Sequence, residues 1–470
     1  MLRILLSVCV GMGLLAGIQR AEAFSLFGEV PAWYTDQTGR DGDPDIYGPM
    51  NLGEEHRWVV PQIHYAFDES FLNYFGQDGV NAVEGAIAIL NALPPMSEIN
   101  IDDYPLFTMR VNYRARDLGM MDLRAMALKI LLEQVGLAPP QRFVYTLRAR
   151  WTPPEQTNYL SIMRNFDPVT FEPTPYINGQ LWTYLGIYEN QDGVVVKAST
   201  IPEPVDPLIL AEPVASSTAL FAYSVFGFGS YFTGLTRDDV GGLRYIYRPE
   251  NQNVETLPPD ATGAAGAFLG GGGGAWTPIS PPSTNIVDPG DGTGGALPGV
   301  PFYPQGLRPG INRLQFVRPG LGVVYQPNAY AVTNQFVETV RVVITNGVER
   351  TISQRVTRVL TAPDILFSAE DLAGDAGANP FLARTAMATS NDAINGSAAL
   401  SGPGQYEGPG GITFNKVGAV FVNQQPNFLY QPGTHSDFVW GSFDGSTNAP
   451  IAYPTGTSIR AIENRVFGGR

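Results

Sequence analysis

The chain has 470 residues, a net charge of −15 and a sequence pI near 4.7. This acidity, without any run of basic residues, argues against nucleic acid or an anionic membrane surface as a partner. Charged residues make up only 16 % of the chain, whereas it contains 53 Gly and 39 Pro, a balance typical of loop-rich, β-rich extracellular proteins.

The N-terminus predicts export. Arg3 supplies a positive charge, an apolar run follows from Ile4 to Ile18, and Ala21-Glu22-Ala23 is a small-x-small cleavage site. Residues 1–23 therefore read as a signal peptide, and the run is too short to span a bilayer comfortably. We expect a secreted protein, either extracellular, at the cell surface or in a bacterial periplasm, with no membrane span after the signal is removed.

Cysteine chemistry is excluded by the same segment. The single cysteine, Cys9, lies inside the signal peptide, so the mature chain has no disulfide, thiol nucleophile or cysteine-ligated metal.

The mature N-terminal stretch carries Asp41, Asp43 and Asp45 at alternate positions, where carboxylate oxygens can wrap a calcium ion. An ordinary solvated turn is the alternative reading, and no other cofactor is indicated.

Several regular elements are predicted in the first half. Residues 58–68 alternate like a strand, Asp68 or Ser70 can cap a helix after that strand, and a helix is expected over 78–93. A second helix, residues 122–137, has apolar residues at helical spacing that predict one buried face. Asp122 is a good N-cap, Gly136 suits the left-handed C-terminal position, and Pro139 forbids continuation.

The rest of the chain predicts a closing helix, a linker and a β-rich region. Thr236 caps a short helix in the stretch LTRDDVGGLRYIY, residues 235–247. Residues 250–309 are rich in Gly and Pro and are expected to form a linker. Residues 310–470 predict short strands, with a hairpin turn at Asn346-Gly347. The predicted organisation is thus a first domain over 24–249, a linker over 250–309 and a sandwich-like β domain over 310–470.

The first domain resembles the matrixin-type metalloproteases, which have a zincin-like fold. The resemblance rests on the strand Ile63–Asp68 followed by a helix, on the central helix and on the closing LTRDDVGGLRYIY. It implies an α+β domain with a twisted sheet, two long helices and a short closing helix. In that family the central helix carries His-Glu-x-x-His-x-x-Gly-x-x-His, whose three histidines hold zinc while the glutamate activates water.

None of those ligands survives in this chain. With Gly136 placed on the family's glycine, the ligand positions fall on Lys129, Glu133 and Pro139, and the base position falls on Ile130. A protonated lysine cannot bind zinc, proline has no ligand atom and isoleucine cannot act as a base. Lys129 and Glu133 are one helical turn apart, which predicts a surface ion pair.

The sequence therefore predicts a secreted, non-catalytic protein with a structural or interaction role, acting through self-assembly or a surface glycan. Two alternatives stay open. One is a carbohydrate- or peptide-binding module, because exposed Trp and Tyr residues can stack on sugar rings. The other is a hydrolase that uses two carboxylates, a site that sequence spacing alone does not reveal.

Overall fold

The computed structural model describes residues 23–34, 48–153, 156–192, 195–205, 228–263, 305–320, 324–344, 348–372, 383–391, 403–416 and 439–467. The predicted signal peptide lies outside these ranges except for Ala23, and the calcium candidates Asp41, Asp43 and Asp45 lie outside them as well. Among the described helices, none combines the length and the apolarity that crossing a bilayer requires.

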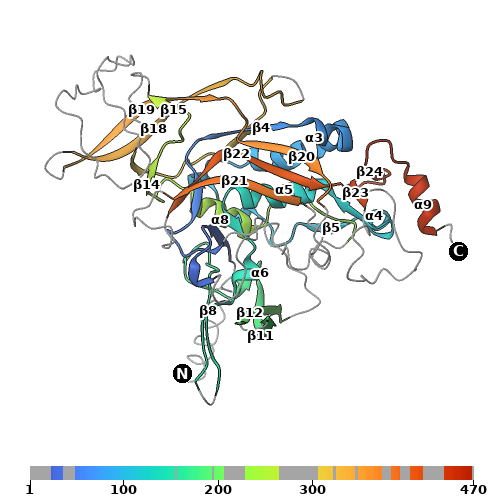
Figure 1. Ribbon diagram of the computed structural model, residues 1–470, viewed down its shortest axis with the longest axis horizontal. Helices are drawn as coiled ribbons and strands as arrows, with labels where there is room; N and C mark the ends of the chain where they lie inside the picture. Colours follow the sequence, from blue (N-terminus) through green and yellow to red (C-terminus); the bar gives the residue numbers. More distant parts are fainter. Residues whose placement is uncertain are drawn as a thin grey trace, which may run out of the picture.

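A six-stranded sheet forms the centre of the molecule (Figure 1). Its strands run in the order β17-β4-β20-β22-β21, and β3 also pairs with β22. All neighbours are parallel except β21 and β22. The strands are β3 (His56–Trp58), β4 (Gln62–Phe67), β17 (Gln315–Val317), β20 (Ile365–Glu370), β21 (Ala383–Asn391) and β22 (Gly404–Asn415).

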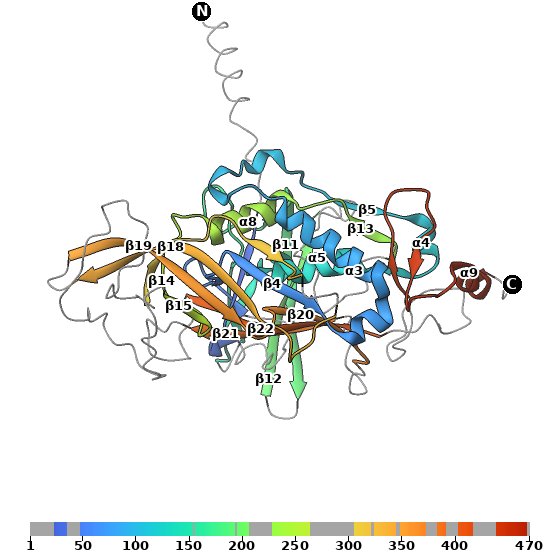
Figure 2. The same ribbon diagram turned by 90° about the horizontal axis from the view of Figure 1, so that it is seen from above.

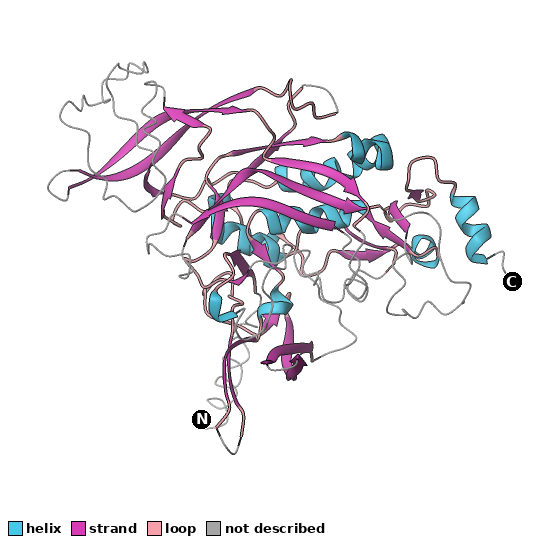
Figure 3. Ribbon diagram, in the orientation of Figure 1, coloured by secondary structure: helices cyan, strands magenta, loops and turns pink. Residues whose placement is uncertain are grey.

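Three helices cover one face of this sheet, as Figure 2 shows: α3 (Glu69–Asn91), α5 (Leu123–Gln134) and α8 (Arg237–Tyr247). Their apolar side chains and those of the sheet form one large core that includes Phe71, Leu131, Tyr247, Phe367 and Phe414. The α+β class predicted from the sequence is confirmed, with more strand than helix (Figure 3).

The helix starts follow from local side chains. Asp68 caps α3 by accepting a hydrogen bond from the Phe71 backbone N–H at 2.9 Å, and Asp122 caps α5 in the same way through Ala125. In α8, Thr236 and Asp239 form a reciprocal capping box. Gly136 follows α5 with φ of 104°, so the predicted stop is confirmed.

The burial of α5 differs from the prediction. The spacing indicated one buried face, yet ten of the twelve residues of α5 are buried, including Glu133 and Gln134. The helix is covered on its other sides as well because strands from distant parts of the chain pack around it. The parallel pairing of β6 (Met120–Asp122) with β23 (Val439–Ser442) places one such strand at its start.

The predicted division into two domains joined by a linker is wrong in the described part of the chain. β17, β20, β21 and β22 follow the predicted linker, but they extend the sheet that contains β3 and β4 instead of forming a separate sandwich. Residues 253–256 and 261–263, assigned to the linker, are strands β14 (Asn253–Thr256) and β15 (Ala261–Gly263). Residues 264–304 of the predicted linker lie outside the described ranges.

A second, five-stranded sheet projects from the central one. It has the order β14-β16-β18-β19-β15, and its longest part is the hairpin of β18 (Val332–Ile344) and β19 (Val348–Leu360), at the upper left of Figure 1. The two arms of the hairpin predicted at Asn346-Gly347 are confirmed, although residues 345–347 themselves lie outside the described ranges. The remaining strand of this five-stranded sheet is β16 (Gln305–Arg308).

Two more hairpins extend below the central sheet in Figure 1. They are formed by β8 (Thr146–Trp151) with β9 (Asn158–Ile162) and by β11 (Gln180–Asp192) with β12 (Val195–Pro204). The smaller strands are β1 (Ser25–Gly28), β2 (Gly48–Pro49), β5 (Met109–Val111), β7 (Leu137–Ala138), β10 (Tyr176–Ile177), β13 (Ser230–Phe232) and β24 (Ile451–Ala452). The short helices are η1 (Met96–Glu98), η2 (Ile101–Asp103), α4 (Tyr113–Asp117), α6 (Pro140–Phe143) and α9 (Ile459–Phe467).

Candidate functional site

Two of the positions onto which the matrixin resemblance would place zinc ligands, Lys129 and Glu133, form an ion pair. Lys129 Nζ lies 3.2 Å from Glu133 Oε1, and the two side chains are only 12 % and 9 % exposed. The prediction of a surface pair is therefore wrong: the pair is largely buried because the chain encloses α5. A buried pair of this kind neutralises both charges locally, and removal of one partner leaves the other poorly solvated.

The other two positions of the implied site, Ile130 and Pro139, have structural roles apart from the Lys129–Glu133 ion pair. Ile130 is 3 % exposed and belongs to the hydrophobic core, and Pro139 lies after β7, where it precedes the short helix α6. No cluster of three or more His, Cys, Asp or Glu side chains in the described part of the chain is arranged to hold a metal ion.

Two histidines lie on strands of the central sheet that follow each other in the chain but do not pair with each other. His56 on β3 and His64 on β4 are buried, at 2 % and 3 % exposed. Burial lowers the pKa of His56 to about 4, so its imidazole is neutral near pH 7. His435 lies outside the described residues.

Buried arginines join the two halves of the chain. Arg57 on β3 donates from Nε to Glu255 Oε1 at 2.6 Å, from Nη1 to the Asn251 carbonyl oxygen at 2.6 Å and from Nη2 to the Arg308 carbonyl oxygen at 3.0 Å. The Arg57 and Glu255 side chains are 1 % and 2 % exposed. These bonds satisfy a guanidinium that could not otherwise be buried.

A second buried network surrounds Asp364, just before β20. Asp364 accepts hydrogen bonds from Arg358 Nη2 at 2.7 Å and from the His64 backbone N–H at 2.8 Å. Burial opposes ionisation of Asp364, but the bonds from His64 and the charge of Arg358 outweigh it and hold the pKa below its usual range. Arg358 also donates to Asp260 at 2.8 Å, so its cation is held between two carboxylates. These carboxylates are occupied structurally, which disfavours them as a hydrolytic pair.

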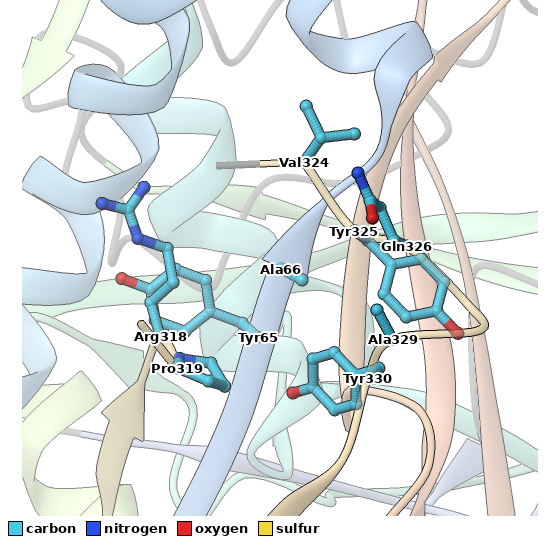
Figure 4. Close-up of a pocket in the computed structure, with 9 residues that line it drawn as sticks. All are labelled: Tyr65, Ala66, Arg318, Pro319, Val324, Tyr325, Gln326, Ala329 and Tyr330. Carbon is cyan, nitrogen blue, oxygen red and sulfur yellow. The ribbon is translucent and has the colours of Figure 1, made fainter. Parts of the chain in front are cut away.

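A small pocket opens between β4 and the segment that follows β17 (Figure 4). Its walls include Tyr65, Arg318, Tyr325, Gln326 and Tyr330. The cavity volume is about 20 Å³, which accommodates roughly one water molecule. The buried Tyr330 hydroxyl has no hydrogen-bond partner within the described residues, and a water there would satisfy it. This pocket is too small for a sugar ring or a peptide side chain.

Sequence reasoning missed the buried ionic networks. The available signal was the presence of single charged residues inside otherwise apolar strands, such as Arg57 beside Trp58 and Arg358 beside Val359. A charge in such a position needs a partner, but the sequence does not say which of many carboxylates supplies it.

Comparison of the chain with family models, with curated proteins and with solved structures returned no match.

Proposed function

We propose that this is an exported, non-catalytic protein with a structural or interaction role at the cell surface or in extracellular material. Its frame is proposed to be that of a matrixin-like protease domain that has lost its metal site. The observation that carries the proposal is the buried Lys129–Glu133 ion pair at the positions where zinc ligands would be needed. A cation and a carboxylate that neutralise each other leave neither a vacant ligand set nor a water-activating base there.

The shape of the molecule supports an interaction role. Its hairpins project well beyond the central sheet (Figure 1). Several of their apolar side chains are exposed, including Trp151 at 50 % and Val337 at 68 %. Exposed apolar side chains on projecting elements favour contact with a partner over a role in a sequestered active site.

Two measurements test this proposal. Elemental analysis of the purified mature chain should give much less than one zinc per chain, and peptide cleavage should be absent with or without a chelator. Fractionation and microscopy of the native cells should locate the chain outside the cytoplasm. One full zinc equivalent together with chelator-sensitive cleavage would contradict the loss of the site, and retention in the cytoplasm would contradict the extracellular role.

A further inference from the structure

A row of three aromatic side chains with an arginine at each end lies beside the β8/β9 hairpin. Arg142 lies over the Phe143 ring at 5.8 Å, and Phe143 meets Tyr34 edge-on with ring centroids 6.3 Å apart. Tyr34 in turn meets Trp33 at 5.9 Å, and Arg148 lies over the Trp33 ring at 4.5 Å. We name these five residues the arginine–aromatic strip. Phe143 and Tyr34 are buried, at 0 % and 6 % exposed, so the part of the strip open to a partner consists of Trp33 and the two arginines.

Arg164 adds a third positive charge to this strip. Its backbone N–H donates to the Phe143 carbonyl oxygen at 2.9 Å. Burial lowers the pKa of Arg164, and repulsion from the positive charge of Arg148 lowers it further. The nearby carboxylate of Glu54 acts in the opposite direction and raises this pKa. The two arginines therefore lie within electrostatic reach of each other, with Glu54 as the neighbouring carboxylate.

The three arginines are not neutralised in the usual way. Within the described residues, Arg142, Arg148 and Arg164 form no ion pair, whereas most buried or half-buried arginines elsewhere do, as Arg57, Arg308 and Arg358 show. The Nε atoms of Arg142 and Arg164 are buried, so contact of these two side chains with an oxyanion falls to their Nη atoms. Excess positive charge is thus concentrated here in a chain with 44 acidic and 29 basic residues.

We propose that the arginine–aromatic strip, together with Arg164, binds the carboxylate or sulfate groups of an anionic polysaccharide. A guanidinium stacked on an aromatic ring keeps its in-plane N–H donors free for a bidentate contact with an oxyanion. Trp33 and, at the end of the same strand as Arg148, the half-exposed Trp151 offer ring surfaces against which the apolar faces of sugars pack. This combination favours a charged sugar over a free inorganic anion.

The overall negative charge does not prevent such binding. At physiological ionic strength the Debye length is about 8 Å, so distant carboxylates are screened while contacts within the strip are not. The same reasoning predicts that affinity falls as salt is added. The proposal rests on the proposed extracellular role, but it is tested on the purified chain and does not depend on the metal or cleavage assays.

The test is calorimetric titration of the mature chain with a uronate oligosaccharide and with a heparin oligosaccharide, with dextran as the neutral polymer. Arg148→Gln and Arg164→Gln are each expected to weaken binding about tenfold, since a hydrogen bond to a charged group contributes at least that much. Arg148→Lys keeps the charge but loses the planar donor pair, and it should also bind more weakly. Arg116→Gln is the matched control because Arg116 lies over Tyr113 at 4.8 Å but pairs with Asp117 at 3.0 Å.

Each outcome decides something. The proposal is supported if the chain binds uronate or heparin but not dextran, and if this binding is lost in the Arg148 variants and kept in Arg116→Gln. The polymer that binds more tightly then identifies carboxylate or sulfate as the recognised group. Absence of binding at low salt, or an equal loss in the control, overturns it. Self-association of the chain that disappears in Arg148→Gln without any polymer binding also overturns it, because the partner is then another protein. Circular dichroism of each variant verifies folding, and Arg148→Lys remains informative should Arg164→Gln not fold.

Discussion

Replacement of Arg57 by methionine should destabilise the whole molecule. The change removes the donors to Glu255 and to the carbonyl oxygens of Asn251 and Arg308, all in a site where Arg57 is fully buried. Methionine replaces only the aliphatic part of the side chain and cannot compensate a buried carboxylate. Breaking a buried ion pair from one side typically costs about 3–5 kcal/mol. That is a large share of the roughly 5–15 kcal/mol that holds most domains folded.

The assay is urea unfolding followed by tryptophan fluorescence and by far-ultraviolet circular dichroism. Trp58 and Trp440 are both almost fully buried and come from opposite halves of the chain, so fluorescence reports on both. Because one sheet and one core contain both halves, the two signals should change together, and Arg57→Met should shift that single transition to lower urea. Arg116→Met, at a half-exposed surface pair, should cost less than about 1 kcal/mol. A loss below about 1 kcal/mol for Arg57→Met, or two transitions of which only one moves, would refute this reasoning.

Three further changes probe other features. Burial raises the pKa of Asp122 to about 7, so the folded state favours the protonated carboxyl. The wild-type protein should therefore lose up to about 4 kcal/mol of stability relative to Asp122→Asn as the pH rises from 4 to 7. Urea titrations that show the same pH dependence for both proteins would count against this prediction. Lys129→Met or Glu133→Leu alone should destabilise more than the double variant, which thermal unfolding checks; additive losses would exclude coupling. Gly404→Ala should cost about 1–3 kcal/mol in the same measurement because its Cβ would lie 2.2 Å from His56 Nε2, and an unchanged midpoint would show that His56 can move aside.

Local chemistry was the part of the fold that the sequence could predict. The start of α5 at Asp122, the capping box of α8 at Thr236 and the stop at Gly136 depend on residues within a few positions of each other. The β18/β19 hairpin was predictable for the same reason, since its turn signal and its alternating strands are adjacent in the chain.

Pairing between distant strands was not predictable. β4 lies between β17 and β20, whose residues come about 250 and 300 positions later in the chain, and both pairings are parallel. Parallel pairing needs a long connection and leaves no turn signature at its ends. The change in composition between residues 250 and 309 therefore predicts a domain boundary. The strands that follow these residues instead join the same sheet as β3 and β4.

The sequence by itself determined that Lys129, Ile130 and Pro139, the positions onto which the matrixin resemblance would place two zinc ligands and the base, lack the required chemistry in any fold. Only the tertiary structure decided what surrounds those positions. Burial of a charge depends on what packs around its helix, and strands from the far end of the chain enclose α5. The Lys129–Glu133 pair expected at the surface consequently lies inside the molecule, where its two charges must compensate each other.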